Sequence, residues 1–178
     1  EADQPPALGQ CDERVPGDLV ATSMGKPWRD LLVQIFTRRP VQESLLIPAV
    51  PEPLIVWIVS GSALVEERQL EGEWMANKVR AGEFFLQTSP RPCELRWRTL
   101  TSEPFRVMHV YLGLPLMKRA ATDVHGPESP LVPLREVSGA ADEVIANQLG
   151  VLCCELLERR TPSTMLVQGL ASSLAVHL

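Results

Sequence analysis

The clearest indication of the fold class of this chain is the segment FRVMHVYL, residues 105–112. Apolar, β-branched and aromatic residues dominate it, as is typical of a β-strand. Successive side chains of a strand point to opposite faces, so Phe105, Val107, His109 and Tyr111 share one face and the even-numbered residues share the other. One of these two faces must line an interior.

Further segments with the same character precede this strand, and each is bounded by glycine, proline or polar residues. They are residues 31–36, 54–59, 63–67, 73–79, 83–88 and 93–99. The segment 54–59 is apolar at every position, which is typical of a strand that is covered on both faces. Short strands at this spacing predict a β-sandwich or a β-barrel.

The periodicity changes from strand to helix after residue 114. We expect a short helix over residues 116–124, a loop rich in proline and glycine over residues 125–139, and a long helix over residues 142–160. Thr161 and Pro162 are expected to start a second long helix, because a hydroxyl can cap free amides and a proline loses nothing at the first helical position. No glycine, asparagine or proline follows the last leucines of that helix before Leu178, so we expect the natural polypeptide to continue.

The charge balance argues against direct nucleic-acid binding by this segment. It carries 17 Lys and Arg against 22 Asp and Glu, and a net charge of −5 offers no overall attraction to a polyanion. Hydrophobic residues make up 45% and charged residues 22%, which is close to the average of soluble globular domains and excludes a disordered chain. No apolar run reaches the ~18–20 residues of a membrane span, and residues 1–10 lack the features of a signal peptide. We therefore expect a cytoplasmic protein with no membrane partner.

Several phrases of the sequence resemble the N-terminal, cupin-type domain of bacterial AraC-type transcription regulators. They are GEW at residues 72–74, RAGEF at 80–84 followed by SPRP at 89–92, the strand at 105–112, and LASSLAVHL at 170–178. The resemblance covers residues 18–178. It implies a mainly β fold with C-terminal helices: a cupin-like barrel, that is a double-stranded β-helix or jelly roll, followed by a helical hairpin.

The same resemblance implies how the chain is organised and what it binds. Residues 1–17 would be a loose N-terminal arm, residues 18–114 the barrel, and residues 115–178 a helical dimerisation region. The partners would be a second copy of the chain and a small-molecule effector. DNA would be bound only through a pair of helix-turn-helix units that lie C-terminal to this segment.

The residues offer little for metal or enzyme chemistry. Metal-binding cupins use histidines and a carboxylate, yet residues 61–80 contain no histidine, and His109, His125 and His177 fall on a strand, a loop and the last helix. The four cysteines include no C-x-x-C pair and are interpreted as reduced structural thiols. No G-x-S-x-G motif or phosphate-binding glycine loop is present. We expect no metal, no cofactor and no enzyme activity; the alternative is a stand-alone cupin isomerase or dioxygenase acting on a small polar substrate.

A barrel of this size can enclose one small ligand among apolar walls and a few polar groups. The candidate ligand contacts are four residues with rings and the arginines that could meet an acid: Trp57, Trp97, His109, Tyr111, Arg38, Arg96 and Arg98. The competing interpretation is core packing for the rings, a hydrogen-bonded interior position for His109, and a solvated face for the arginines.

Two apolar stripes on the predicted long helices are candidates for a dimer interface. Their leucines and isoleucine recur at intervals of three and four residues, as in packed helices. The stripes consist of Ile145, Leu149, Leu152, Leu156, Leu166, Leu170 and Leu174. The alternative is that both helices simply cap the barrel, because this spacing also suits packing within one subunit.

Overall fold

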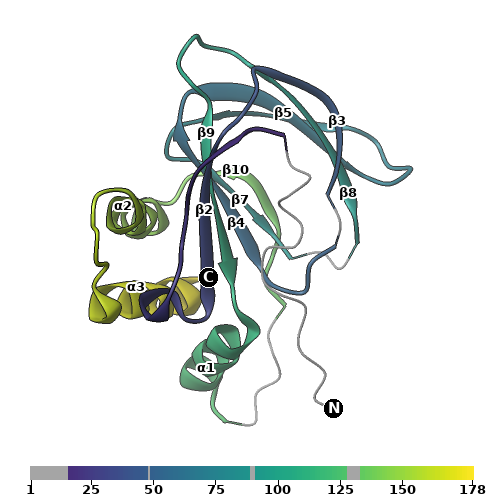
Figure 1. Cartoon of the computed structure of the whole chain (residues 1–178). Coiled ribbons are helices and arrows are strands. Elements are labelled where there is room, and N and C mark those ends of the chain that lie inside the picture. Colours follow the sequence, from purple (N-terminus) through teal and green to yellow (C-terminus); the bar gives the residue numbers. More distant parts are fainter. Residues whose placement is uncertain (1–15, 48, 89–90, 128–132) are drawn as a thin grey trace, which may run out of the picture.

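The computed structural model of the chain describes residues 16–47, 49–88, 91–127 and 133–178. These residues form ten strands, which make two antiparallel sheets, and three α-helices, which cover the outer face of the larger sheet (Figure 1). The two sheets face each other across an interior of apolar side chains. The predicted fold class, a cupin-like jelly roll followed by helices, is confirmed.

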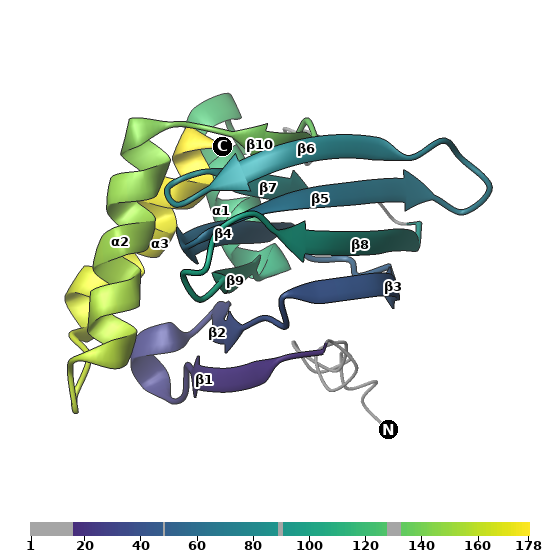
Figure 2. The ribbon, with the colours of Figure 1, turned by 90° about the horizontal axis from the view of Figure 1, so that it is seen from above.

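The larger sheet has the strand order β1-β2-β9-β4-β7-β10. Its strands are β1 (Asp18–Thr22), β2 (Leu31–Thr37), β9 (Arg106–Leu112), β4 (Leu54–Ser60), β7 (Phe84–Gln87) and β10 (Val137–Ala140). The smaller sheet has the order β3-β8-β5-β6, and Figure 2 shows these strands side by side. They are β3 (Val41–Ile47), β8 (Cys93–Thr99), β5 (Ser62–Gln69) and β6 (Met75–Arg80). Apart from β1–β2 and β5–β6, neighbouring strands are not consecutive in the chain, so much of the fold depends on long-range pairing.

Strand β9 has buried side chains on both faces, as its sequence predicts. Val107, His109 and Tyr111 point into the barrel, whereas Met108 and Val110 point toward the helices. The side chains inside the barrel form the inner core: Phe36, Leu45, Ile58, Ala63, Val65, Val79, Phe85, Trp97, Phe105 and Val107. Those between the larger sheet and the helices form the outer core: Trp28, Leu31, Val33, Ile35, Ile55, Phe84, Leu86, Met108, Val110, Leu112, Leu116, Met117, Ala120, Ile145, Leu149, Leu152, Cys153, Val167, Ala171, Leu174 and Ala175.

The two long helices begin at side chains that accept hydrogen bonds from their free amides. Asp142 caps α2 (Glu143–Leu157) by accepting from the backbone N–H groups of Val144 and Ile145. Ser163 caps α3 (Thr164–His177) by accepting from the N–H of Leu166. The prediction that Thr161 and Pro162 start this helix is wrong by a few residues, because Ser163 offers the capping hydroxyl closer to the apolar run.

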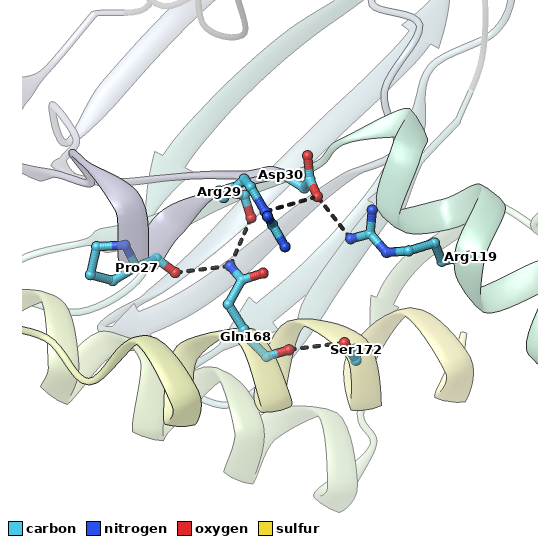
Figure 3. Close-up of polar contacts among 6 residues, drawn as sticks. All are labelled: Pro27, Arg29, Asp30, Arg119, Gln168 and Ser172. Atoms are coloured by element: carbon cyan, nitrogen blue, oxygen red, sulfur yellow. Dashed lines mark hydrogen bonds and ion pairs between the residues drawn. The ribbon is translucent and has the colours of Figure 1, made fainter.

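A polar junction ties two helices to the turn between β1 and β2 (Figure 3). Gln168 of α3 donates from Nε2 to the carbonyl oxygens of Pro27, in the 3-10 turn η2 (Lys26–Trp28), and of Arg29, at 2.9 and 2.8 Å. Arg119 of α1 (Leu114–His125) pairs with Asp30 at 2.8 Å. These bonds fix the orientation of α1 and α3 relative to the start of β2.

Three strands lie outside the predicted strand segments, namely β1, β3 and β10. The prediction of a loop over residues 125–139 is wrong for β10, which pairs with β7 through Val137 opposite Leu86 and Ala140 opposite Phe84. The four residues Val-Ser-Gly-Ala have no pattern of their own, so pairing at the sheet edge creates this strand. The region C-terminal to residue 114 therefore contributes a strand to the barrel as well as helices.

No helix within the described ranges is both long and apolar enough to cross a membrane.

Candidate ligand-binding cavity

A cavity of about 70 Å³, the inner cavity, lies between the two sheets. Apolar side chains make most of its wall, and a few polar groups interrupt them. Its lining residues are Arg38, Leu45, Ile47, Leu54, Val56, Ile58, Val65, Glu67, Phe85, Gln87, Leu95, Trp97, Phe105, Val107, His109 and Tyr111. Apolar walls with a few placed polar groups are the usual composition of a small-molecule site.

Arg38 and His109 form the most buried polar pair of this cavity. Arg38, immediately after β2, is 7% exposed, and its Nη2 lies 2.9 Å from Nε2 of His109, which is 6% exposed. A guanidinium only donates hydrogen bonds, so His109 must accept at Nε2 and carry its proton at Nδ1. The imidazole is therefore neutral in this arrangement.

The Arg38 guanidinium also has protein partners besides His109. Its Nη1 donates to the carbonyl oxygen of Pro16 at 3.2 Å, and its central carbon lies 4.3 Å from the centroid of the Phe36 ring. The Phe36 and Tyr111 rings flank His109, with centroids 5.3 and 6.3 Å from the imidazole. This end of the cavity is a preorganised cluster of rings around one positive charge.

Trp97 forms another wall of the cavity in a defined orientation. Its indole N–H donates to the carbonyl oxygen of Arg39 at 2.9 Å. A buried indole usually satisfies its N–H in this way. The ring therefore presents an apolar face to the cavity.

A second depression, the outer hollow, adjoins the inner cavity and encloses about 420 Å³. It lies between the β5–β6 hairpin and β10, and it includes the exposed residues Glu73, Met75 and Arg91. Ile47, Glu67 and Gln87 line both spaces. Ligand sites commonly enclose roughly 300–1,000 Å³, so the inner cavity alone would hold only a small group, and a larger ligand would extend into the outer hollow.

Glu67 is the carboxylate at the junction of the two spaces. Burial raises the pKa of Glu67, and the nearby carboxylate of Glu136 raises this pKa as well, whereas a hydrogen bond from the Ser138 hydroxyl lowers it. Burial also raises the pKa of the neighbouring Cys93 thiol to about 11, with contributions from Glu67 and Glu136. The thiol is therefore protonated at neutral pH and is not a nucleophile.

The structure brings together four of the candidate ligand residues. Arg38, Trp97, His109 and Tyr111 all line the inner cavity. Their contact with a ligand stays a prediction. The residues that we did not single out are Glu67, Gln87 and most of the apolar wall, although Glu67 continues the alternation of the buried Ala63 and Val65 along β5.

The remaining candidates lie elsewhere, which corrects their prediction as cavity residues. Trp57 is on the opposite face of β4 from Val56 and Ile58 and packs against the outer core. Strand β4 is covered on both faces, so its apolar sequence carried no signal of which face is inward.

Arg96 is likewise absent from the cavity wall. It forms two hydrogen bonds of 2.8 Å with Glu66, and its guanidinium lies 4.1 Å from the centroid of the Trp74 ring. Its strand neighbours Leu95 and Trp97 face the cavity, so Arg96 is on the outer face of the smaller sheet, where Arg98 is also exposed.

The predicted dimer seam also needs correction. Ile145, Leu149, Leu152 and Leu174 are 0–4% exposed in the single chain, so they have no surface left for a second copy. Their spacing reflects packing within the subunit. Of the other three residues, Leu156 and Leu170 pack in part against the outer core, and Leu166 is 39% exposed. The apolar residues that remain exposed on α2 and α3 are Val144, Val151, Leu157, Met165, Leu166 and Val176.

Within the part of the chain that the structure describes, no group of three or more His, Cys, Asp or Glu side chains is placed to hold a metal ion. His177 instead lies 3.3 Å from Asp142, where it links the end of α3 to the start of α2.

Comparison with solved structures defines the class of fold. The chain matches the AraC-like transcriptional activator CuxR with a TM-score of 0.53 at 14% identity, over 82% of this chain and 49% of CuxR. It matches ToxT K231A from Vibrio cholerae with a TM-score of 0.55 at 15% identity, over 81% of this chain and 54% of ToxT. The resemblance to an AraC-type regulatory domain is thereby confirmed at the level of the fold.

The chain spans about half the length of the regulators that it matches. No protein-family model matches the sequence. No curated protein matches it either.

Proposed function

We propose that this chain is the effector-binding and dimerisation domain of a bacterial AraC-type transcription regulator. A small molecule in the barrel would control how attached helix-turn-helix units are placed on DNA. The observation that carries the proposal is the inner cavity, with its Arg38–His109 pair and its aromatic walls, inside a fold shared with CuxR.

The ligands of a structural neighbour support a largely apolar effector. ToxT has been solved with an unsaturated fatty acid and with (E)-4-(8-methylnaphthalen-1-yl)but-3-enoic acid, and these structures match the chain with TM-scores of 0.51 and 0.52. The apolar wall of the inner cavity suits a ligand body of that kind.

Strand β9 offers a physical connection between the cavity and the helices. His109 and Tyr111 line the cavity, while Met108, Val110 and Leu112 pack in the outer core against the helical layer. A ligand that displaces β9 would alter the packing of α1 to α3. It would change the equilibrium between two arrangements only as far as it binds them with different affinity.

Thermal-shift screening of metabolites tests the effector proposal, because a ligand that binds only the folded state must raise its apparent stability. The screen compares Trp97→Phe, which alters the cavity wall, with the matched variant Trp74→Phe on the outer face. We expect the effector to shift the Tm of the wild type and of Trp74→Phe, and to shift that of Trp97→Phe less. An equal shift in both variants, or no active compound, would contradict the proposal.

Dimerisation is proposed for the exposed apolar residues of α2 and α3. Val151 on α2 is 41% exposed, and Met165 on α3 is 87% exposed. An apolar surface of this kind is typical of an interaction site.

Sedimentation equilibrium should show a dimer for the wild type and a monomer for Val151→Asp. Leu46→Asp, at an exposed apolar position on β3, is the control and should remain dimeric. A monomeric wild type, or dissociation of the control alone, would refute the interface.

The attached DNA-binding units are a proposal that the partial coverage of CuxR and ToxT supports. The gene provides the test. A basic segment with two helix-turn-helix patterns after Leu178 is expected, and a stop codon directly after it would contradict the regulator proposal.

A further inference from the structure

Glu67 places a carboxylate in a barrel wall that is otherwise mostly apolar. It lies near the end of β5, after the inward-facing Ala63 and Val65, and it lines both the inner cavity and the outer hollow. It is the only carboxylate in the wall of the inner cavity as the described residues define it. A ligand that extends from one space to the other would therefore lie near this side chain.

The Glu67 carboxylate is only partly satisfied by the protein. The Ser138 hydroxyl donates to Oε1. No arginine or lysine of the described chain lies within ion-pair distance of Glu67, and Oε2 has no protein hydrogen-bond partner there. The nearby carboxylate of Glu136 makes the surroundings more negative. A partly buried carboxylate in this state favours a cation or a strong hydrogen-bond donor.

The basic residues around the two spaces are already engaged. Arg38 binds His109 and the Pro16 carbonyl at the far end of the inner cavity, and Arg68 of the outer hollow is paired with Glu94 at 2.6 Å and lies over the Trp74 ring. Arg91 also has a partner. The Glu67 carboxylate is therefore the polar group at the junction that is left to bind a ligand.

We propose that the effector is an amphiphile with a protonated amine, which Glu67 binds through Oε2 while the apolar part of the effector fills the inner cavity. This inference rests on the proposed function, because it specifies the chemistry of the same effector. The alternative of a carboxylic acid held by Arg38 is an outcome of the test.

Hexylamine and hexanoate are matched probes, since they share an apolar chain and differ in the charge of the head group. Their affinities for the whole chain can be measured by calorimetry at neutral pH, together with those of Glu67→Gln and Glu136→Gln. Glutamine at position 67 retains an acceptor for Ser138, so this variant is expected to fold. Glu136→Gln removes a carboxylate from the wall of the outer hollow and leaves Glu67 in place.

Hexylamine should bind the wild type more tightly than hexanoate does, and Glu67→Gln should weaken hexylamine binding by about tenfold or more. Glu136→Gln should weaken it by less. Tighter binding of hexanoate, equal losses in both variants, or binding of neither probe would overturn the inference. The proposed function is judged separately by the metabolite screen with Trp97→Phe, so an acidic effector found there would refute the amine and leave the regulator proposal intact.

Discussion

Burial of Glu67 at the junction of the two spaces makes the stability of the fold depend on pH. The folded state raises the pKa of Glu67 above its usual value, mainly because burial disfavours the charged form. The folded state therefore binds this proton more tightly than the unfolded state does. The corresponding stabilisation is fully present below the unfolded pKa and is lost as the pH rises through the folded pKa.

The variant Glu67→Gln removes this titration. Urea denaturation between pH 4 and pH 7 should show the wild type losing stability relative to Glu67→Gln as the pH rises, because the charged form of Glu67 is the one that burial disfavours. Parallel pH profiles of the two proteins would show that Glu67 is not desolvated.

Asp142 changes the stability of the fold with pH in the opposite direction to Glu67, because the folded state stabilises the charged form of Asp142. A backbone hydrogen bond from Ile145, a bond from His177 and a further amide from Val144 hold the pKa of Asp142 below its usual value. Asp142→Ala should lower the Tm at neutral pH through loss of the α2 cap. The stabilisation by Asp142 is present above its unfolded pKa and is lost as the pH falls through its folded pKa.

Thermal denaturation from pH 7 down to pH 3 measures the effect, with Glu143→Gln in the first turn of α2 as the control. The difference in Tm between Asp142→Ala and the wild type should shrink in acid. A difference that stays constant with pH would contradict the role of the carboxylate.

Within single elements of the fold, a helical glycine and a turn glycine differ in whether the backbone can accept a side chain. Gly169 lies within α3, and a Cβ placed there would meet nothing within 4 Å. Gly61, in the turn between β4 and β5, has a φ of +76°, and a Cβ there would lie 3.0 Å from the carbonyl oxygen of Pro104. The helix tolerates a side chain, whereas the turn does not.

Gly169→Ala should therefore stabilise the chain by about 0.5–1 kcal/mol, since alanine loses less backbone entropy in a helix. Gly61→Ala should destabilise it. Urea denaturation at one protein concentration compares the two variants. Destabilisation by Gly169→Ala would indicate that the surface of α3 is covered by something other than solvent.

At the scale of the whole molecule, the helices and the larger sheet share the outer core, so neither layer is complete without the other. Leu149 of α2 is fully buried in that core. Leu149→Ala should cost about 2–5 kcal/mol. Helical circular dichroism and tryptophan fluorescence should then lose their native signals at one common, lowered temperature. Val124→Ala, at an exposed position of α1 outside the proposed dimer surface, is the control and should change little. Earlier loss of the helical signal would reveal two independent units.

The kinds of element and their approximate places follow from local patterns in the amino-acid sequence. The alternation in β9 separated the residues of its two faces correctly, and the helix over residues 142–160 was located to within a few residues of α2. Strand periodicity and helix periodicity are local properties of the chain, so they can be read without knowledge of the partners.

Which faces meet depends on packing between segments that are remote in sequence. The sequence patterns predict Trp57 in the cavity and Leu149 in a dimer seam, yet Leu149 belongs to the outer core and Trp57 packs against it. A strand covered on both faces has two apolar sides, and its sequence does not say which side meets the barrel and which meets a helix. An apolar stripe on a helix indicates that this face is covered, but the surface that covers it belongs to segments that are remote in sequence. The same holds for Glu67, whose place at the junction of the two spaces depends on the pairing of β5 with β8 and on the return of β10 beside β7.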